Sequence, residues 1–111
     1  MRRFAAAVLT AAAITAAGVA VAAPASAEGT FQTKANLNMR ACQYVSTCAV
    51  EITVPKGADV YLICYKKGTS VNGDNIWYLG YYNPSGGSYE GYMSGDYINT
   101  GHDPNPSISA C

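Results

Sequence analysis

The sequence has little charge, a single histidine and no cluster of lysine or arginine side chains. Charged residues make up 13% of its 111 residues, and seven basic residues balance seven acidic ones. Nucleic acids and anionic membrane surfaces depend on concentrated positive charge for affinity, so we expect neither as the main partner. No segment shows the apolar spacing of an amphipathic helix, which argues against a helical fold.

The first 27 residues have the three-part pattern of a secretory signal. Arg2 and Arg3 form a basic start, an apolar run extends from Phe4 to Ala23, and Ala25-Ser26-Ala27 supplies a small-residue cleavage site. An uncleaved anchor of this length could span a bilayer, but the alanine-rich composition favours cleavage. We therefore expect an exported, faintly acidic mature chain from Glu28 to Cys111 that has no membrane contact after cleavage.

All four cysteines lie in the expected mature chain: Cys42, Cys48, Cys64 and Cys111. An even number in a small exported domain indicates a disulfide framework. Three pairings are possible, and a bridge between Cys42 and Cys48 across five residues is the least demanding, which leaves Cys64 for Cys111. Structural zinc is disfavoured because its ligands typically form two close pairs. We expect no metal and no cofactor.

The mature chain predicts short strands separated by turns. Alternating apolar and polar residues indicate strands at 37–40, 50–54, 60–65, 76–82 and 89–93. Turns are expected at 55–57, at 66–74, where Asn72-Gly73 is a hairpin signal, and at 83–88. Five short strands at these intervals predict an all-β fold, a small disulfide-stapled barrel. Its core is expected to hold Val54, Val60, Leu62, Leu79 and Ile98.

Four segments carry a family pattern in the correct order. Ala35-Asn36-Leu37-Asn38-Met39-Arg40 matches an L-N-V-R start, and residues 54–60 match a hydrophobic-x-K-G-x-x-V turn. Trp77 lies where a central strand carries tryptophan, and residues 91–98 match a closing G-Y/W-V-S-x-x-Y-L segment. Together they resemble the bacterial SH3 (SH3b) domain, an SH3-like barrel found in exported and cell-wall-associated proteins.

The resemblance covers residues 34–101, which leaves 28–33 as a short lead-in and 102–111 as a tail tied back by Cys111. Some exported SH3b relatives also carry a cysteine after the third strand and another at the chain end, which agrees with Cys64 and Cys111. The sequence departs from the family at the Cys42 to Cys48 loop and at an insertion from Gly68 to Asn75. Both lie where ligand preference is usually set.

The sequence offers no legible catalytic group. Oxidised cysteines provide no thiolate, and His102 lies in a proline-punctuated tail where a surface role is expected. The acidic residues are scattered over strands and turns rather than paired across a cleft. The SH3b resemblance also implies binding, so we expect a non-enzymatic protein without catalytic residues.

Aromatic side chains are the most distinctive feature. Nine tyrosines and one tryptophan are more than a barrel core of this size can hide, and tyrosine rings suit binding surfaces. Packing alone is expected to account for Tyr61, Tyr65, Tyr78 and Tyr89. The resemblance implies that other rings converge on a groove between two long loops, where SH3-type domains receive extended peptides. These candidate ligand-binding residues are Tyr44, Trp77, Tyr81, Tyr92 and Tyr97.

Tyr81 either continues this groove or falls into the core, and Arg40 and Asp96 are expected at its polar rim. The first functional hypothesis is a secreted monomer that binds a peptide or glycan-peptide of peptidoglycan, free in the medium or associated with the cell wall. The second is a disulfide-stabilised extracellular factor, such as an inhibitor, toxin-like protein or surface component. It would bind another protein through the Cys42 to Cys48 loop and the Gly68 to Asn75 insertion.

Overall fold

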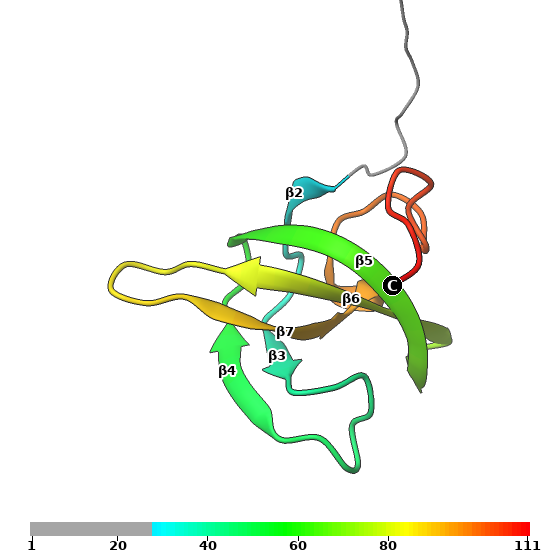
Figure 1. Cartoon of the computed structure of the whole chain (residues 1–111), viewed down its shortest axis with the longest axis horizontal. Helices are drawn as coiled ribbons and strands as arrows, with labels where there is room; N and C mark the ends of the chain where they lie inside the picture. The colour runs from blue at the N-terminus through cyan, green and yellow to red at the C-terminus, as the bar shows by residue number, and fades with distance from the viewer. Residues whose placement is uncertain (1–27) are drawn as a thin grey trace, which may run out of the picture.

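The computed structural model describes residues 28–111, so the signal sequence expected at 1–27 lies outside the described residues. Six antiparallel strands form one sheet, in the order β2-β5-β6-β7-β3-β4, that curls into a half-barrel (Figure 1). The strands are β2 (Gly29–Gln32), β3 (Leu37–Arg40), β4 (Val50–Val54), β5 (Asp59–Val71), β6 (Asp74–Tyr82) and β7 (Tyr89–Ser94). A 3₁₀ helix, η3 (Gly95–Tyr97), follows β7. The all-β prediction is confirmed.

The prediction of five strands was wrong in number, because Gly29–Gln32 forms a sixth. This segment, expected as a lead-in, pairs with β5 from Gly29 opposite Leu62 to Gln32 opposite Asp59. Four residues with one large apolar side chain, Phe31, are too short to show a period of two. Pairing with a longer neighbour stabilises the strand, and Phe31 packs against the core.

Strand β5 also continues through most of the segment predicted as a loop. The turn itself lies at Asn72-Gly73, where both residues have positive φ (52° and 87°), as a type I′ hairpin turn requires. Val71 and Asp74 pair directly across it. Between this pair and the Lys67–Ile76 pair the register shifts. Residues 68–70 on β5 therefore face Asn75 alone and bulge away from the ladder.

The core lies on one face of the curled sheet. Leu37 and Met39 alternate inward on β3 and are 3% and 0% exposed, while Asn38 between them is exposed. The prediction that Leu79 on β6 belongs to the core was wrong. Leu79 is half-buried, and Ile76 and Tyr78 of the same strand point into the core instead. Apolar side chains occupy both faces of this strand, so periodicity could not select the inner one. The core cluster comprises Leu37, Met39, Val54, Val60, Leu62, Ile76, Tyr78, Met93, Ile98 and Ile108.

The C-terminal tail returns to the sheet and completes this core. The Tyr65 N–H donates to the Ser109 carbonyl (3.1 Å), and the Cys111 N–H donates to the Tyr65 carbonyl (2.9 Å). Ile108 is 4% exposed within the core. Cys64 and Cys111 form a disulfide with their Cα atoms 4.8 Å apart, and Figure 1 shows the chain end lying against β5. The tail is therefore an integral part of the fold.

The second disulfide joins Cys42 and Cys48, with Cα atoms 5.4 Å apart, so the structure forms both bridges that the spacing favours. No cysteine of residues 28–111 is free. Two disulfides indicate an oxidising environment, as found outside the cell. Within the same residues, no helix has the length and apolarity needed to cross a membrane.

Candidate binding groove

A groove of about 480 Å³ is formed where several strands and two loops meet, beside the edge of the core at Leu37. Its lining comes from β3, β4, the β5 bulge, β6, β7, η3 and the loop closed by the Cys42–Cys48 bridge, which we call the disulfide loop. The lining residues are Asn36, Leu37, Asn38, Arg40, Val45, Thr53, Thr69, Ser70, Val71, Trp77, Ser94 and Tyr97.

Trp77 forms part of the floor of this groove. Its side chain is only 2% exposed, and its indole Nε1–H donates to the Thr69 carbonyl oxygen at 2.8 Å. A buried indole needs such a partner, because an unsatisfied N–H in the interior is costly. The ring therefore shapes the groove and holds the β5 bulge in place, rather than presenting an open face for stacking.

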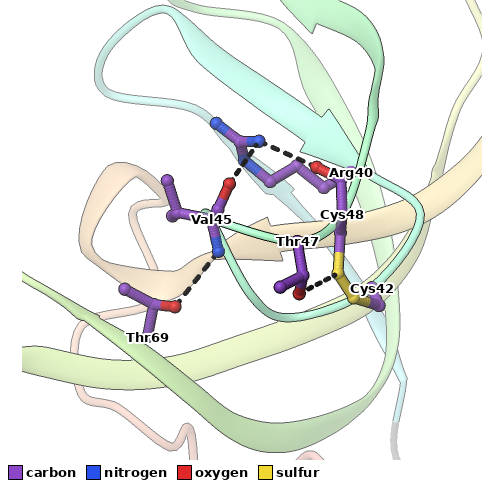
Figure 2. Close-up of a disulfide and its surroundings, with 6 residues drawn as sticks. All are labelled: Arg40, Cys42, Val45, Thr47, Cys48 and Thr69. Carbon is purple, nitrogen blue, oxygen red and sulfur yellow. Dashed lines mark hydrogen bonds between the residues drawn. A yellow bond between two sulfur atoms is a disulfide. The ribbon is translucent and has the colours of Figure 1, made fainter.

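The disulfide loop forms one wall and is attached to the β5 bulge by two hydrogen bonds. The Thr69 N–H donates to the Gln43 carbonyl at 3.1 Å. The Val45 N–H donates to Thr69 Oγ1, also at 3.1 Å, as Figure 2 shows. A Cβ atom on Gly68 would overlap the Gln43 carbonyl oxygen, so only glycine permits this approach. The two segments that depart from the SH3b pattern thus contact each other at the edge of the groove.

Arg40 links the groove to the inside of the disulfide loop. Its Nη1 donates to the carbonyl oxygens of Val45 (3.2 Å) and Cys48 (3.0 Å), as Figure 2 shows. Both acceptors lie within the ring closed by the disulfide, so the covalent bridge and the guanidinium hold the same few residues. Arg40 is half-buried and is the only charged side chain that residues 28–111 place in the lining.

The part of the lining from β3 and β4 carries neutral hydrogen-bonding groups. Asn38 Oδ1 accepts from Thr53 Oγ1 (3.0 Å), and Asn36 Oδ1 accepts from the Lys56 N–H (2.8 Å). These bonds orient both amides through their oxygens, which leaves the two Nδ2 amino groups as donors to a ligand. The groove can therefore hydrogen-bond carbonyl oxygens without placing a second charge beside them.

The predicted site residues divide into two groups. Trp77 and Tyr97 line the groove. Tyr44 projects from the disulfide loop with 46% of its surface exposed and lies outside the lining. Tyr81 and Tyr92, on β6 and β7, are half-buried and also lie outside the lining. Tyr81 therefore belongs to neither the groove nor the core cluster.

Tyr92 instead has the ammonium group of Lys66 5.5 Å from its ring centroid, within the range of a cation–π interaction. Arg40, expected at the rim, does line the groove, whereas Asp96 accepts a hydrogen bond from Asn72 Nδ2 (2.9 Å) and borders a second hollow. The sequence patterns predicted aromatic ligand-binding residues but not the neutral polar residues of the lining. The signal was present in the outward-facing polar residues of β3 and β4, Asn38 and Thr53.

The second hollow, about 180 Å³, contains two interacting carboxyl groups, Asp74 and Asp103. Burial and the hydrogen bond to Asp103 raise the pKa of Asp74 to about 6. Burial also acts on Asp103, but hydrogen bonds from Asp74, Thr100 and Tyr78 outweigh it and lower its pKa. One proton therefore resides on Asp74 in weakly acidic solution.

Asp103 connects the tail to the core through this arrangement. Its Oδ1 accepts from the Tyr78 hydroxyl (2.7 Å) and from Thr100 Oγ1 (2.6 Å), and burial and the Asp103 contact raise the pKa of Tyr78. The same Tyr78 oxygen accepts from the Asn105 N–H at 2.9 Å. Within residues 28–111, no three His, Cys, Asp or Glu side chains are placed to hold a metal ion. The hydrogen bonds of Asp103 and Tyr78 hold the tail against the core.

Comparison with known proteins assigns no family to this chain. Neither a protein-family model nor a curated protein sequence matches it. The function of the groove must therefore be inferred from its own geometry and chemistry.

Proposed function

We propose that the chain is a secreted, non-enzymatic binding module of the SH3b type, which holds a peptide or glycan-peptide of the bacterial cell wall in the groove. One observation carries the proposal: three of the four segments that resemble SH3b domains meet there. The first contributes Asn36, Leu37, Asn38 and Arg40, the third Trp77, and the fourth Ser94 and Tyr97. Residues far apart in sequence thus line one recognition surface.

The size and composition of the groove support binding. Its volume of about 480 Å³ falls within the range of roughly 300–1,000 Å³ typical of ligand sites. A rigid tyrosine, Tyr97, lies beside amide and hydroxyl groups, a combination that suits extended peptides and sugars. The two disulfides and the leader-like start of the sequence support export.

The composition of the lining also favours ligand binding rather than catalysis. Among the described residues of the lining, the ionisable side chains are Arg40 and Tyr97, and no histidine or carboxylate lies beside the hydroxyl groups. Covalent or acid–base catalysis requires an activated group held by such a partner. A groove of this composition is therefore suited to holding a ligand unchanged.

Retention on purified peptidoglycan tests the proposal. The oxidised chain from residue 28 is expected to co-sediment with peptidoglycan, and a denatured control is expected to remain in solution. Tyr97→Ala should reduce retention about tenfold or more, as loss of a central aromatic contact does. Tyr81→Ala is the control, because Tyr81 is also a half-buried tyrosine and lies outside the lining. Equal retention of the folded and denatured chains would discard the proposal.

A second candidate, a disulfide-stabilised factor that binds another protein, is favoured by exposed apolar side chains around the disulfide loop. Tyr44, Val45 and Val50 are 46%, 40% and 45% exposed. Under this alternative, Tyr44→Ser and Val50→Ser should abolish binding to the partner while Tyr97→Ala leaves it intact. Capture from the culture medium of the producing organism with these three variants separates the two functions.

A further inference from the structure

We propose that the ligand of the groove is a peptide bearing a carboxylate group, and that Arg40 is the residue that binds this carboxylate. The inference rests on the proposed use of the groove for binding, and it specifies the chemistry of what is bound. It depends on the position, hydrogen bonding and isolation of one guanidinium group.

Arg40 is a half-buried cation without an acidic partner. No carboxylate of residues 28–111 forms an ion pair with it, and it is the only charged side chain among the lining residues. The guanidinium is partly withdrawn from water, since one of its hydrogen bonds is part-buried and the other exposed. Partial burial of a cation is favoured when acceptors or an anion compensate for the lost water. Two carbonyl oxygens provide part of that compensation. An incoming carboxylate would complete it.

The hydrogen-bonding capacity of the guanidinium is only partly used. Nη1 makes both bonds to the disulfide loop, and Figure 2 shows the other terminal nitrogen pointing away from the two carbonyl groups. Nη2 and Nε therefore retain three N–H donors, which is the edge that binds a carboxylate through two parallel hydrogen bonds. A carboxylate is the planar two-oxygen group that fits this edge.

The disulfide loop orients this edge before any ligand arrives. Val45 and Cys48 accept from the same nitrogen at 3.2 and 3.0 Å, and the bridge from Cys42 to Cys48 restricts both acceptors. A guanidinium held in this way loses little conformational freedom on binding, so more of the interaction energy appears as affinity. Arg40 is thus a specificity-determining residue supported by the disulfide.

The remaining lining identifies the group that carries the carboxylate. The Nδ2 groups of Asn36 and Asn38 are oriented by their own oxygen contacts, and they can donate to peptide carbonyl groups. A multiply charged anion such as phosphate would find a single cation here, whereas a carboxylate on a neutral peptide matches one charge surrounded by amides and hydroxyls. A short peptide with a free carboxyl group is therefore the class of ligand that this groove fits.

A pair of peptides that differ only in this charge tests the inference. The probes are N-acetyl-triglycine as the free acid and as its C-terminal amide, titrated at millimolar concentrations into the oxidised chain from residue 28. Binding is followed by NMR through the Arg40 Nε–H and Trp77 Nε1–H signals. The free acid should shift both signals and bind about tenfold or more tightly than the amide, as expected for a charge-assisted hydrogen-bonded pair.

Variants of Arg40 assign the effect to the guanidinium. Arg40→Gln should bind both peptides equally weakly, Arg40→Lys should recover part of the preference, and Lys56→Gln, which removes an exposed charge at a turn, should behave as wild type. If Arg40→Gln does not fold, the comparison of acid and amide on the wild-type chain, followed through the Arg40 Nε–H signal, still tests whether the carboxylate binds at Arg40. Equal binding of the two peptides, or no shift with either, overturns the inference.

The result is separable from the proposed function. Retention on peptidoglycan without discrimination between acid and amide would remove the role of Arg40 and leave cell-wall binding standing. Discrimination without retention on peptidoglycan would leave Arg40 as a carboxylate-binding residue and remove the cell wall as the source of the ligand.

Discussion

Trp77 on β6 donates its indole N–H to the carbonyl oxygen of Thr69 on the β5 bulge, 2.8 Å away. The bond joins the floor of the groove to its wall. The indole is 2% exposed, and the bond to the half-buried Thr69 is part-buried. The tryptophan that resembles the central SH3b residue is thus a structural support of the groove.

Removing this donor is expected to destabilise the fold. Trp77→Phe should lower the free energy of unfolding by about 1–3 kcal/mol, because the Thr69 carbonyl group loses its part-buried hydrogen-bond donor. Denaturation by urea, followed by circular dichroism, measures the change. Tyr81→Phe, on the same face of β6, is the control and should remain within about 0.5 kcal/mol of wild type. Equal effects of the two substitutions would show that the Trp77–Thr69 bond contributes little.

Gly68 is expected to control the contact between the disulfide loop and the β5 bulge. Gly68→Ala places a methyl group on the Gln43 carbonyl oxygen, so the loop must move, at a cost of about 1–3 kcal/mol. Ser70→Ala, two residues later and exposed, should cost less than about 0.5 kcal/mol. Amide NMR shifts at Thr69 and Val45 would report the movement directly. Unchanged shifts in the Gly68 variant would contradict this packing.

The two disulfides should differ in their effects. The Cys42–Cys48 bridge closes a ring with a sequence separation of 6, and the Cys64–Cys111 bridge one of 47. The chain-entropy model assigns about 2.4 kcal/mol to the short ring and about 4 kcal/mol to the long one. The double alanine variant of Cys64 and Cys111 should therefore melt at the lower temperature, and removal of the tail after Gly101, which also removes Ile108 and Asp103, should lower the melting temperature at least as much.

The short bridge should matter more for binding than for stability. Its ring holds the Val45 and Cys48 carbonyl groups that orient Arg40. The double alanine variant of Cys42 and Cys48 is expected to lose the preference for the free-acid peptide while it remains folded. Equal melting temperatures for the Cys42/Cys48 and Cys64/Cys111 double alanine variants would contradict the expectation that the longer ring stabilises the fold more.

The carboxyl pair should make stability depend on pH. The folded-state pKa of Asp74 is about 6, above the unfolded value of about 3.9. Protonated Asp74 therefore adds fully to the free energy of unfolding below about pH 3.9, and this stabilisation is lost as the pH rises through about 6. The lowered pKa of Asp103 acts oppositely, since its contribution is lost as the pH falls below about 4. Solvent screening limits the Asp74 effect to about 1 kcal/mol.

Asp74→Asn isolates the first of these effects. The amide retains an oxygen for the Ile76 N–H, which Asp74 Oδ1 accepts at 2.9 Å, and it cannot ionise. Its unfolding free energy should be nearly constant between about pH 5 and about pH 7.5, whereas that of the wild type falls. Glu90→Gln, which changes an exposed carboxyl group on β7, is the control and should follow the wild type. A parallel decline in Asp74→Asn would exclude Asp74 as the cause.

Local sequence signals predicted the strands that have clear alternation and the turn with special backbone geometry. Leu37–Arg40 and Val50–Val54 form strands with the predicted bounds, and the hairpin turns at Asn72-Gly73. The segment Gly29–Gln32 could not be recognised, because its strand state depends on β5 as a partner. The inner face of β6 could not be recognised either, because Ile76, Trp77 and Tyr78 are all buried.

The candidate site was predictable only in part. Trp77, Tyr97 and Arg40 were expected at a groove and line it, whereas Tyr44, Tyr81 and Tyr92 lie outside its lining. Which rings share a surface depends on strand order and on the register shift in β5, and both are set by pairings between distant segments.

By itself, the sequence determined an all-β chain with an even set of cysteines suited to oxidising conditions, since alternation, turn residues and cysteine count are local properties. Tertiary structure alone decided that the disulfide loop packs on Gly68 and that its carbonyl groups bind Arg40. It also decided that the tail docks through Asp103 and Ile108. These contacts form only when the curled sheet brings separate strands together, so no short stretch of sequence encodes them.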